Sequence, residues 1–167
     1  RVMGLGTVLD TTRFRSIIAD ARDLPPTQVK ALIVGEHGDS MTPLWSCATV
    51  AGIPLTGLLA VNEQNQLFDR TKGSGAEVIR RKGGAGYAVG LGIAKVIHSI
   101  ALDSRKILPV STRMNGQYGM RKVCLSLPTV VGRAGVINAM EVELWPKEVA
   151  GLQQSAKALE VTWTKLG

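Results

Sequence analysis

The sequence predicts an α+β fold in which antiparallel β-strands pack with long helices. Long stretches with a helical spacing of apolar residues occur in each third of the chain. Short β-prone segments in the C-terminal half are separated by turn signals rather than by helices, which favours antiparallel pairing. With 167 residues, 45% hydrophobic and 20% charged, the chain is long enough for one domain with a hydrophobic core. We therefore expect residues 1–167 to form a single domain.

The N-terminal part is expected to contain one helix and two strands. A helix over residues 11–21 has a periodic apolar face and ends before the proline pair at 25–26, which cannot continue it. Residues 29–34 are apolar and β-branched, as is typical of a buried strand. Residues 45–51 predict a second strand, which ends in a turn at Gly52.

Two long helices are expected in the middle of the chain. Residues 62–82 are polar with spaced apolar positions, and Gly73 and Gly75 predict a kink or break there. Residues 87–102 combine small residues with an apolar face, which predicts a helix packed closely on its neighbours. The glycine-rich segment 83–86 before it suits a ligand at a positive helix terminus, and it equally suits tight helix packing.

The last third predicts a sheet followed by a helix. The β-prone segments are 107–111, 123–131 and 139–144, with Asn115-Gly116 as the hairpin signal between the first two. Pro146 lies at an early position of the final helix. The apolar residues of that helix fall on one stripe, at Val149, Leu152, Ala156, Leu159, Trp163 and Leu166. It should lie on the sheet or against another subunit.

The stretch that most suggests a function is residues 35–40, GEHGDS, directly after the strand at 29–34. The strand should end by presenting the imidazole of His37. Glycines on both sides of His37 permit unusual backbone conformations and let a ligand approach closely. Such a histidine can exchange protons, bind a metal or cap a turn.

A second polar group precedes it, in residues 9–15, LDTTRFR. Asp10 falls at or near a helix N-terminus, and Arg13 follows one turn later, so both side chains can point the same way. The carboxylate could orient the ring of His37, and the guanidinium could hold an anionic substrate. The alternative is that Asp10 is an ordinary N-cap and Arg13 its solvated neighbour.

Together, residues 9–15 and 35–40 resemble the paired signatures of the lactate/malate dehydrogenase family. Further stretches agree with the family, namely 41–46 (MTPLWS), 51–55 (AGIPL), 107–111 (ILPVS), 115–119 (NGQYG) and 128–136 (PTVVGRAGV). The resemblance runs nearly end to end but covers only the C-terminal, substrate-binding half of the family. It implies an NAD-dependent L-2-hydroxyacid dehydrogenase, of lactate or malate type, that acts in carbohydrate metabolism.

The family resemblance also implies a role for each polar residue. Arg13 would bind the carboxylate of a 2-keto or 2-hydroxy acid, His37 would be the acid/base group, and Asp10 would orient His37. Ala85 stands where lactate dehydrogenases usually have a threonine in the substrate pocket, and its context is closer to malate dehydrogenases. An alanine there leaves room for a side group larger than methyl.

The dinucleotide-binding part of the family does not match this chain. A G-x-G-x-x-G fingerprint fails at Leu9 after Gly4 and Gly6. The resemblance implies that the N-terminal Rossmann domain, with a mobile-loop arginine, precedes this segment. Of the residues present, the resemblance places Val89 on the nicotinamide face and Leu5 where many lactate dehydrogenases have a serine near the nicotinamide amide. The isolated segment is expected to lack NAD affinity and activity.

Composition argues against several other partners. The net charge is +7, but the basic residues are scattered and only 4% of residues are aromatic, which disfavours nucleic-acid binding. No apolar run is long enough to span a membrane, and two histidines make a zinc site improbable. Cys47 and Cys124 predict buried, reduced thiols in a cytoplasmic protein.

Two alternatives to the dehydrogenase remain. The segment could be a non-catalytic oligomerisation or binding module that has inherited these motifs, or part of an NAD-dependent glycosidase, which would need metal ligands. For the dehydrogenase, the partners implied are the small acid substrate, the protein's own Rossmann domain and further copies of the chain. A homotetramer is favoured over a dimer.

Overall fold

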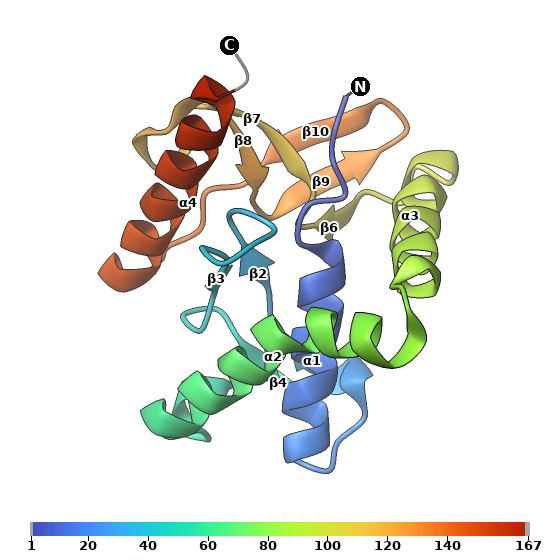
Figure 1. Ribbon diagram of the computed structural model, residues 1–167, viewed down its shortest axis with the longest axis vertical. Coiled ribbons are helices and arrows are strands. Elements are labelled where there is room, and N and C mark those ends of the chain that lie inside the picture. The colour runs from blue at the N-terminus through green and yellow to red at the C-terminus, as the bar shows by residue number, and fades with distance from the viewer. Residues whose placement is uncertain (1, 166–167) are drawn as a thin grey trace.

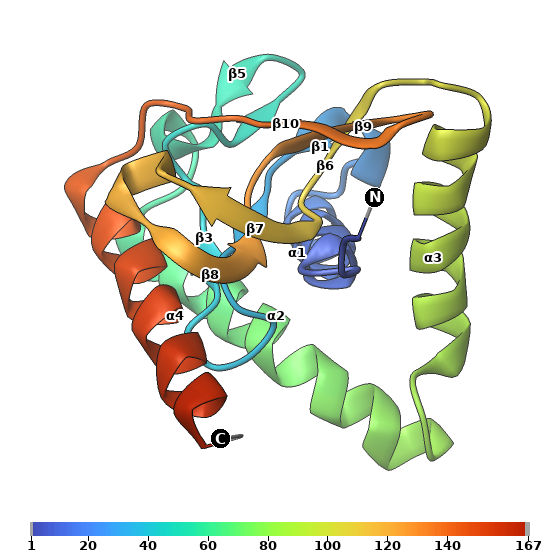
Figure 2. The ribbon, with the colours of Figure 1, turned by 90° about the horizontal axis from the view of Figure 1, so that it is seen from above.

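Helix α1 is the central element of the fold. In the computed structural model, which describes residues 2–165, α1 (Val8–Ala21) lies between α3 (Gly86–Ala101) and α4 (Pro146–Thr164) (Figures 1 and 2). Helix α2 (Val61–Lys82) crosses α1 and leads to the start of α3. The four predicted helices are thus confirmed, with α1 beginning three residues earlier than expected.

The strands form several small antiparallel sheets rather than one large sheet. Two three-stranded sheets have the orders β1-β4-β5 and β10-β9-β6, and two hairpins pair β2 with β3 and β7 with β8. The first five strands are β1 (Val29–Lys30), β2 (Ile33–Val34), β3 (Thr42–Pro43), β4 (Thr49–Val50) and β5 (Ile53–Pro54). The last five are β6 (Lys106–Leu108), β7 (Ser111–Asn115), β8 (Arg121–Ser126), β9 (Thr129–Gly132) and β10 (Gly135–Ala139). The α+β class with antiparallel pairing is confirmed.

Apolar packing on several sides of α1 and α4 holds these pieces together. Phe14 of α1 is fully buried and meets Trp45 edge to face, with ring centroids 4.9 Å apart. On another side, Val8 belongs to a cluster with Val96 of α3 and with residues of β6 and β9. Leu152 of α4 is fully buried in a cluster with β7 and β8. Burial of these side chains contributes roughly 1.5 to 3 kcal/mol each.

Some predicted strands have different bounds in the structure. The run at 29–34 is divided between β1 and β2, which belong to different sheets, and only the end of the 45–51 segment is a strand. The strand expected at 139–144 was wrong, because β10 ends at Ala139 and residues 140–144 belong to no strand. Local β-propensity does not reveal the tight turn between β9 and β10, in which Gly132 pairs with Gly135. The hairpin at Asn115-Gly116 is confirmed, with Gly116 at a φ of 127°.

The helices also differ in detail from the expectations. Helix α2 is continuous through Gly73 and Gly75, so there is no break, although its course bends partway along (Figure 1). Helix α3 packs closely along only one narrow side, where Gly92, Val96 and Ser99 are buried, and the expected apolar face is partly exposed, with Ile97 at 57%. On α4, Trp163 is 75% exposed, and Leu166 lies outside the described residues.

The cysteines were expected to be buried, and this was wrong: Cys47 and Cys124 are both free and exposed. Partial burial, with a smaller contribution from Glu148, nevertheless raises the pKa of the Cys47 thiol.

No helix within residues 2–165 combines the length and apolar character that a membrane crossing requires.

Candidate active site

The backbone after β2 presents His37 at the end of a short loop. Gly35 has a φ of 88°, a conformation that favours glycine, and it forms two backbone hydrogen bonds with Ser126, of 2.9 and 3.0 Å. Strand β3 then returns and pairs with β2, with Val34 opposite Thr42. The side chain of His37 is 59% exposed, so a ligand can reach it.

Two threonines, Thr7 just before α1 and Thr11 in its first turn, fix the distance between the helix and β2. The hydroxyl of Thr7 donates to the carbonyl of Ile33 at 2.6 Å. One turn later, the hydroxyl of Thr11 accepts the Ile33 N–H at 2.9 Å. Thr7 and Ile33 are fully buried and Thr11 nearly so. Because both bonds converge on Ile33, the first turn of α1 lies against the strand that leads to His37.

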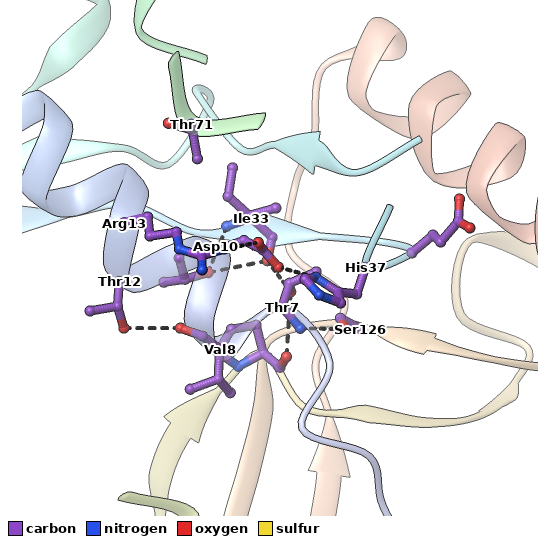
Figure 3. Close-up of polar contacts among 12 residues, drawn as sticks. Thr7, Val8, Asp10, Thr12, Arg13, Ile33, His37, Thr71 and Ser126 are labelled. Carbon is purple, nitrogen blue, oxygen red and sulfur yellow. Dashed lines mark hydrogen bonds and ion pairs between the residues drawn. The ribbon is translucent and has the colours of Figure 1, made fainter. Parts of the chain in front are cut away.

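Asp10 lies in this first turn, between His37 and Arg13 (Figure 3). Its Oδ2 is 2.6 Å from Nδ1 of His37, and its Oδ1 is 3.5 Å from Nη1 of Arg13. Thr7, not Asp10, is the residue that precedes the helix, and the Asp10 carboxylate is 2% exposed. The ordinary N-cap alternative for Asp10 is therefore wrong, because its carboxylate binds the ring and the guanidinium instead.

Arg13 is held beside this carboxylate and covered by α2. Its side chain is 15% exposed, and among the described residues Asp10 is the only carboxylate with which it forms an ion pair. A Cβ built at Gly75 of α2 would lie 3.1 Å from Nη1, so the helix passes close to the guanidinium. Since an arginine has five N–H donors, several remain available for a second anion.

The arrangement of Asp10, His37 and Arg13 can exchange a proton with a ligand and bind its carboxylate. If the Asp10 carboxylate accepts the proton on Nδ1, the other ring nitrogen, Nε2, is left to exchange a proton with a ligand. The adjacent guanidinium can make two parallel bonds to a ligand carboxylate. A small molecule with a carboxylate next to an oxygen that gains or loses a proton matches both groups.

The three other predicted residues lie outside this group. Ala85 precedes α3 and Val89 lies in its first turn, and both are half-buried. Leu5 packs on α3, where a Cβ at Gly92 would lie 3.3 Å from its Cδ2. Gly92 is three residues after Val89, so Leu5 contacts the same side of α3 that carries Val89.

The glycines before α3 border a hollow at the α2–α3 junction. It has a volume of about 680 Å³ and is lined by Lys82, Gly83, Gly84, Gly86, Tyr87, Gly90 and Leu91. A Cβ at Gly83, Gly84 or Gly86 would meet nothing within 4 Å. Tight helix packing therefore does not explain these three glycines, whereas it does explain Gly92.

Sequence reasoning missed several residues that shape the site. Thr7 and Thr11 have no motif that marks them as links to Ile33. Gly75 was noticeable in the sequence, because glycine destabilises a helix interior, but only the structure shows that it lies against the guanidinium of Arg13.

Within residues 2–165, no three histidine, cysteine, aspartate or glutamate side chains are grouped to hold a metal ion.

Comparison with known proteins relates this site to a family. Residues 7–166 match the family model described as lactate/malate dehydrogenase, alpha/beta C-terminal domain. The chain is 41% identical over 162 residues to an L-lactate dehydrogenase of Synechococcus sp. (strain JA-3-3Ab), covering 95% of this chain and 53% of that protein. It is 40% identical over 162 residues to a malate dehydrogenase of Chlorobium luteolum, covering 96% and 52%. The chain thus spans about half the length of the curated relatives it matches.

A solved structure agrees closely with the fold. The crystal structure of the minor L-lactate dehydrogenase from Enterococcus mundtii, in its ligands-bound form, aligns with a TM-score of 0.96 at 34% identity. The alignment covers 100% of this chain and 55% of that chain.

Proposed function

Since the chain belongs to the lactate/malate dehydrogenase family, we propose that it is the C-terminal, substrate-binding part of an NAD-dependent L-2-hydroxyacid dehydrogenase. The intact protein would interconvert a 2-keto acid and its L-2-hydroxy acid, with L-lactate and L-malate as the candidate products. The observation that carries this proposal is the group formed by Asp10, Arg13 and His37, in which a 2.6 Å contact joins the carboxylate to the ring.

Arg13 binds the carboxylate of the substrate. Its planar guanidinium can donate two parallel hydrogen bonds and stays charged at any working pH, which a lysine cannot reproduce. Each charge-assisted bond contributes roughly 1.5 to 3 kcal/mol. The cover that α2 provides at Gly75 limits water around the guanidinium and strengthens these bonds.

His37 exchanges the proton of the reaction. In the reducing direction, Nε2 donates its proton to the ketone oxygen as that oxygen becomes a hydroxyl, and in the oxidising direction it takes the proton back. Asp10 keeps the ring oriented and stabilises the protonated imidazole through Nδ1. NAD(H), when bound, supplies or accepts the hydride at the substrate carbon.

Of the described residues, we assign Val89 and Leu5 to the nicotinamide, since Leu5 packs on the side of α3 that carries Val89. Ala85, before the same helix, limits the substrate side group less than a threonine would. The remainder of the dinucleotide would be held by an N-terminal Rossmann domain, which corresponds to the part of the relatives that this chain does not span.

The test is a kinetic assay of the intact protein, that is, the chain joined to its upstream part. NADH oxidation would be followed with pyruvate and with oxaloacetate, in the wild type, His37→Asn and Arg13→Lys. His37→Asn should lower kcat on the order of 10²- to 10⁴-fold. Arg13→Lys should raise KM for the keto acid, because one of two parallel bonds is lost.

Matched controls come from the same chain. His98→Asn changes the exposed histidine of α3, and Arg70→Lys changes an arginine that pairs with Asp20 on the surface. Both should retain activity. Full activity in His37→Asn, or turnover of neither keto acid by the wild type, would contradict the proposed function and favour a non-catalytic module.

We further propose that the intact protein is a cytoplasmic homotetramer. The free thiols fit a reducing compartment. Several large apolar side chains of α3 are exposed, including Tyr87 at 91% and Leu91 at 75%, which is unusual for a surface without a partner. Light scattering of the purified intact protein would measure the number of subunits, and a monomer or a dimer would contradict this proposal.

A further inference from the structure

Helix α4 contacts the loop that carries His37 through one buried serine. Ser155 is fully buried, and its hydroxyl donates to the carbonyl of Ser40 at 2.6 Å. The same oxygen accepts the backbone N–H of Glu36 at 3.2 Å. Glu36 and Ser40 lie on either side of His37, so a single hydroxyl joins the two ends of the loop.

The loop and the helix are too close for a larger side chain. A Cβ at Gly35 would overlap the hydroxyl of Ser155. One turn earlier on α4, a Cβ at Gly151 would lie 2.6 Å from Oγ1 of Thr42. Small residues on α4 therefore allow the loop to lie directly on the helix. An alanine at 155 would fit, but it would leave the Glu36 N–H and the Ser40 carbonyl without this partner.

His37 depends on such support from its backbone. Its side chain is 59% exposed, and among the described residues its ring forms one hydrogen bond, to Asp10. Packing against other side chains thus does little to fix the ring. Its position is set mainly by the loop backbone, which is held by the Gly35–Ser126 pairing, by the contact between the Glu36 and Ser40 side chains, and by Ser155.

We propose that Ser155 is a positioning residue for His37. By joining Glu36 to Ser40, its hydroxyl keeps the loop in the conformation in which Nδ1 of His37 lies 2.6 Å from Asp10. Ser155 does not contact the ring and acts only through the loop. The inference rests on the proposed function in so far as the position of His37 matters for turnover.

The kinetic test compares Ser155→Ala with Ser99→Ala in the intact protein. Ser99 is also fully buried on a helix, and its hydroxyl donates to the Val131 carbonyl at 2.8 Å, so its loss is a matched control. Alanine is a better helix former than serine, so both helices should persist. Ser155→Ala should lower kcat about 10- to 100-fold, as expected for a misplaced acid/base group. KM for the keto acid should change less than about threefold, because Arg13 lies on α1 and not on the loop.

Two further measurements do not depend on turnover. The proton shared by His37 and Asp10 should give a downfield NMR signal in the wild type, assigned by its loss in His37→Asn. This signal should weaken or vanish in Ser155→Ala and persist in Ser99→Ala. In the wild type, the Glu36 amide should exchange slowly with deuterium because Ser155 accepts its hydrogen, and this second measurement requires no variant to fold.

The outcomes separate the inference from the proposed function. If the wild type turns over keto acids and Ser155→Ala matches Ser99→Ala in kcat and in the NMR signal, the positioning role is wrong. Fast exchange of the Glu36 amide also overturns it. If the wild type turns over no keto acid, the proposed function fails, while the NMR signal still decides whether Ser155 holds His37 against Asp10.

Discussion

Replacing Gly75 with alanine should stabilise the protein and weaken substrate binding at the same time. Gly75 lies inside α2, where an alanine is favoured over glycine by about 1 kcal/mol. The new methyl group, however, would lie 3.1 Å from Nη1 of Arg13, which is closer than ordinary van der Waals contact. The guanidinium must therefore move by a few tenths of an ångström, away from the position in which it is held beside Asp10.

The two effects have different sizes and different readouts. A gain of about 1 kcal/mol should raise Tm by about 2 to 4 °C in a domain of this size. Weakening one of the two bonds between Arg13 and the substrate carboxylate would lose up to roughly 1.5 to 3 kcal/mol, or about 10- to 150-fold in KM. Because the displacement is small, we expect the lower end, about a tenfold rise in KM with kcat less affected.

Gly73 provides the control for this experiment. It lies in the same helix, and a Cβ there would meet nothing within 4 Å. Gly73→Ala should therefore give a similar rise in Tm with an unchanged KM. Thermal unfolding and keto acid titrations of the intact variants measure both quantities. Equal KM values in Gly75→Ala and Gly73→Ala would refute the idea that α2 sets the position of Arg13.

Three other predictions concern the surroundings of His37 and one cysteine. Asp10→Asn should lower kcat on the order of 10²- to 10⁴-fold without abolishing folding, because an amide cannot stabilise the protonated ring of His37; a kcat near wild type in steady-state assays would contradict the orienting role. Thr11→Val should destabilise the protein by about 1 to 3 kcal/mol in urea unfolding, because it leaves the buried N–H of Ile33 without its 2.9 Å partner. Cys47 should react with iodoacetamide more slowly at pH 8 in the native protein than in urea, because burial raises the pKa of its thiol and lowers the thiolate fraction, and equal rates would contradict that shift.

The helices and the polar motifs were accessible from sequence because each depends on local chemistry. Apolar spacing and proline positions predicted the end of α1 at Ala21 and the start of α4 at Pro146, although α1 begins three residues earlier than predicted. The two motifs around Asp10 and His37 could be recognised because the residue types and their spacing are specific. Strand bounds were harder, as the expected strand at 139–144 shows, because the pairing partner decides where a strand lies.

Contacts between distant segments required the structure. Asp10 and His37 are 27 positions apart, and they meet because Thr7 and Thr11 bind Ile33. No local pattern marks those threonines. Ser155 is separated from Ser40 by 115 positions, and in the sequence it is an ordinary residue of a helix. Its hydroxyl matters only because α4 lies on the loop.

Neighbouring residues set which elements form and which chemical groups are available, since helix formation, turns and side-chain chemistry are local properties. Packing between distant segments sets which groups meet, which glycines make room for a neighbour and which apolar faces stay exposed. Gly75 shows the difference. Within a helix, glycine is less stable than alanine, and only the structure shows that a side chain at this position would crowd the guanidinium of Arg13.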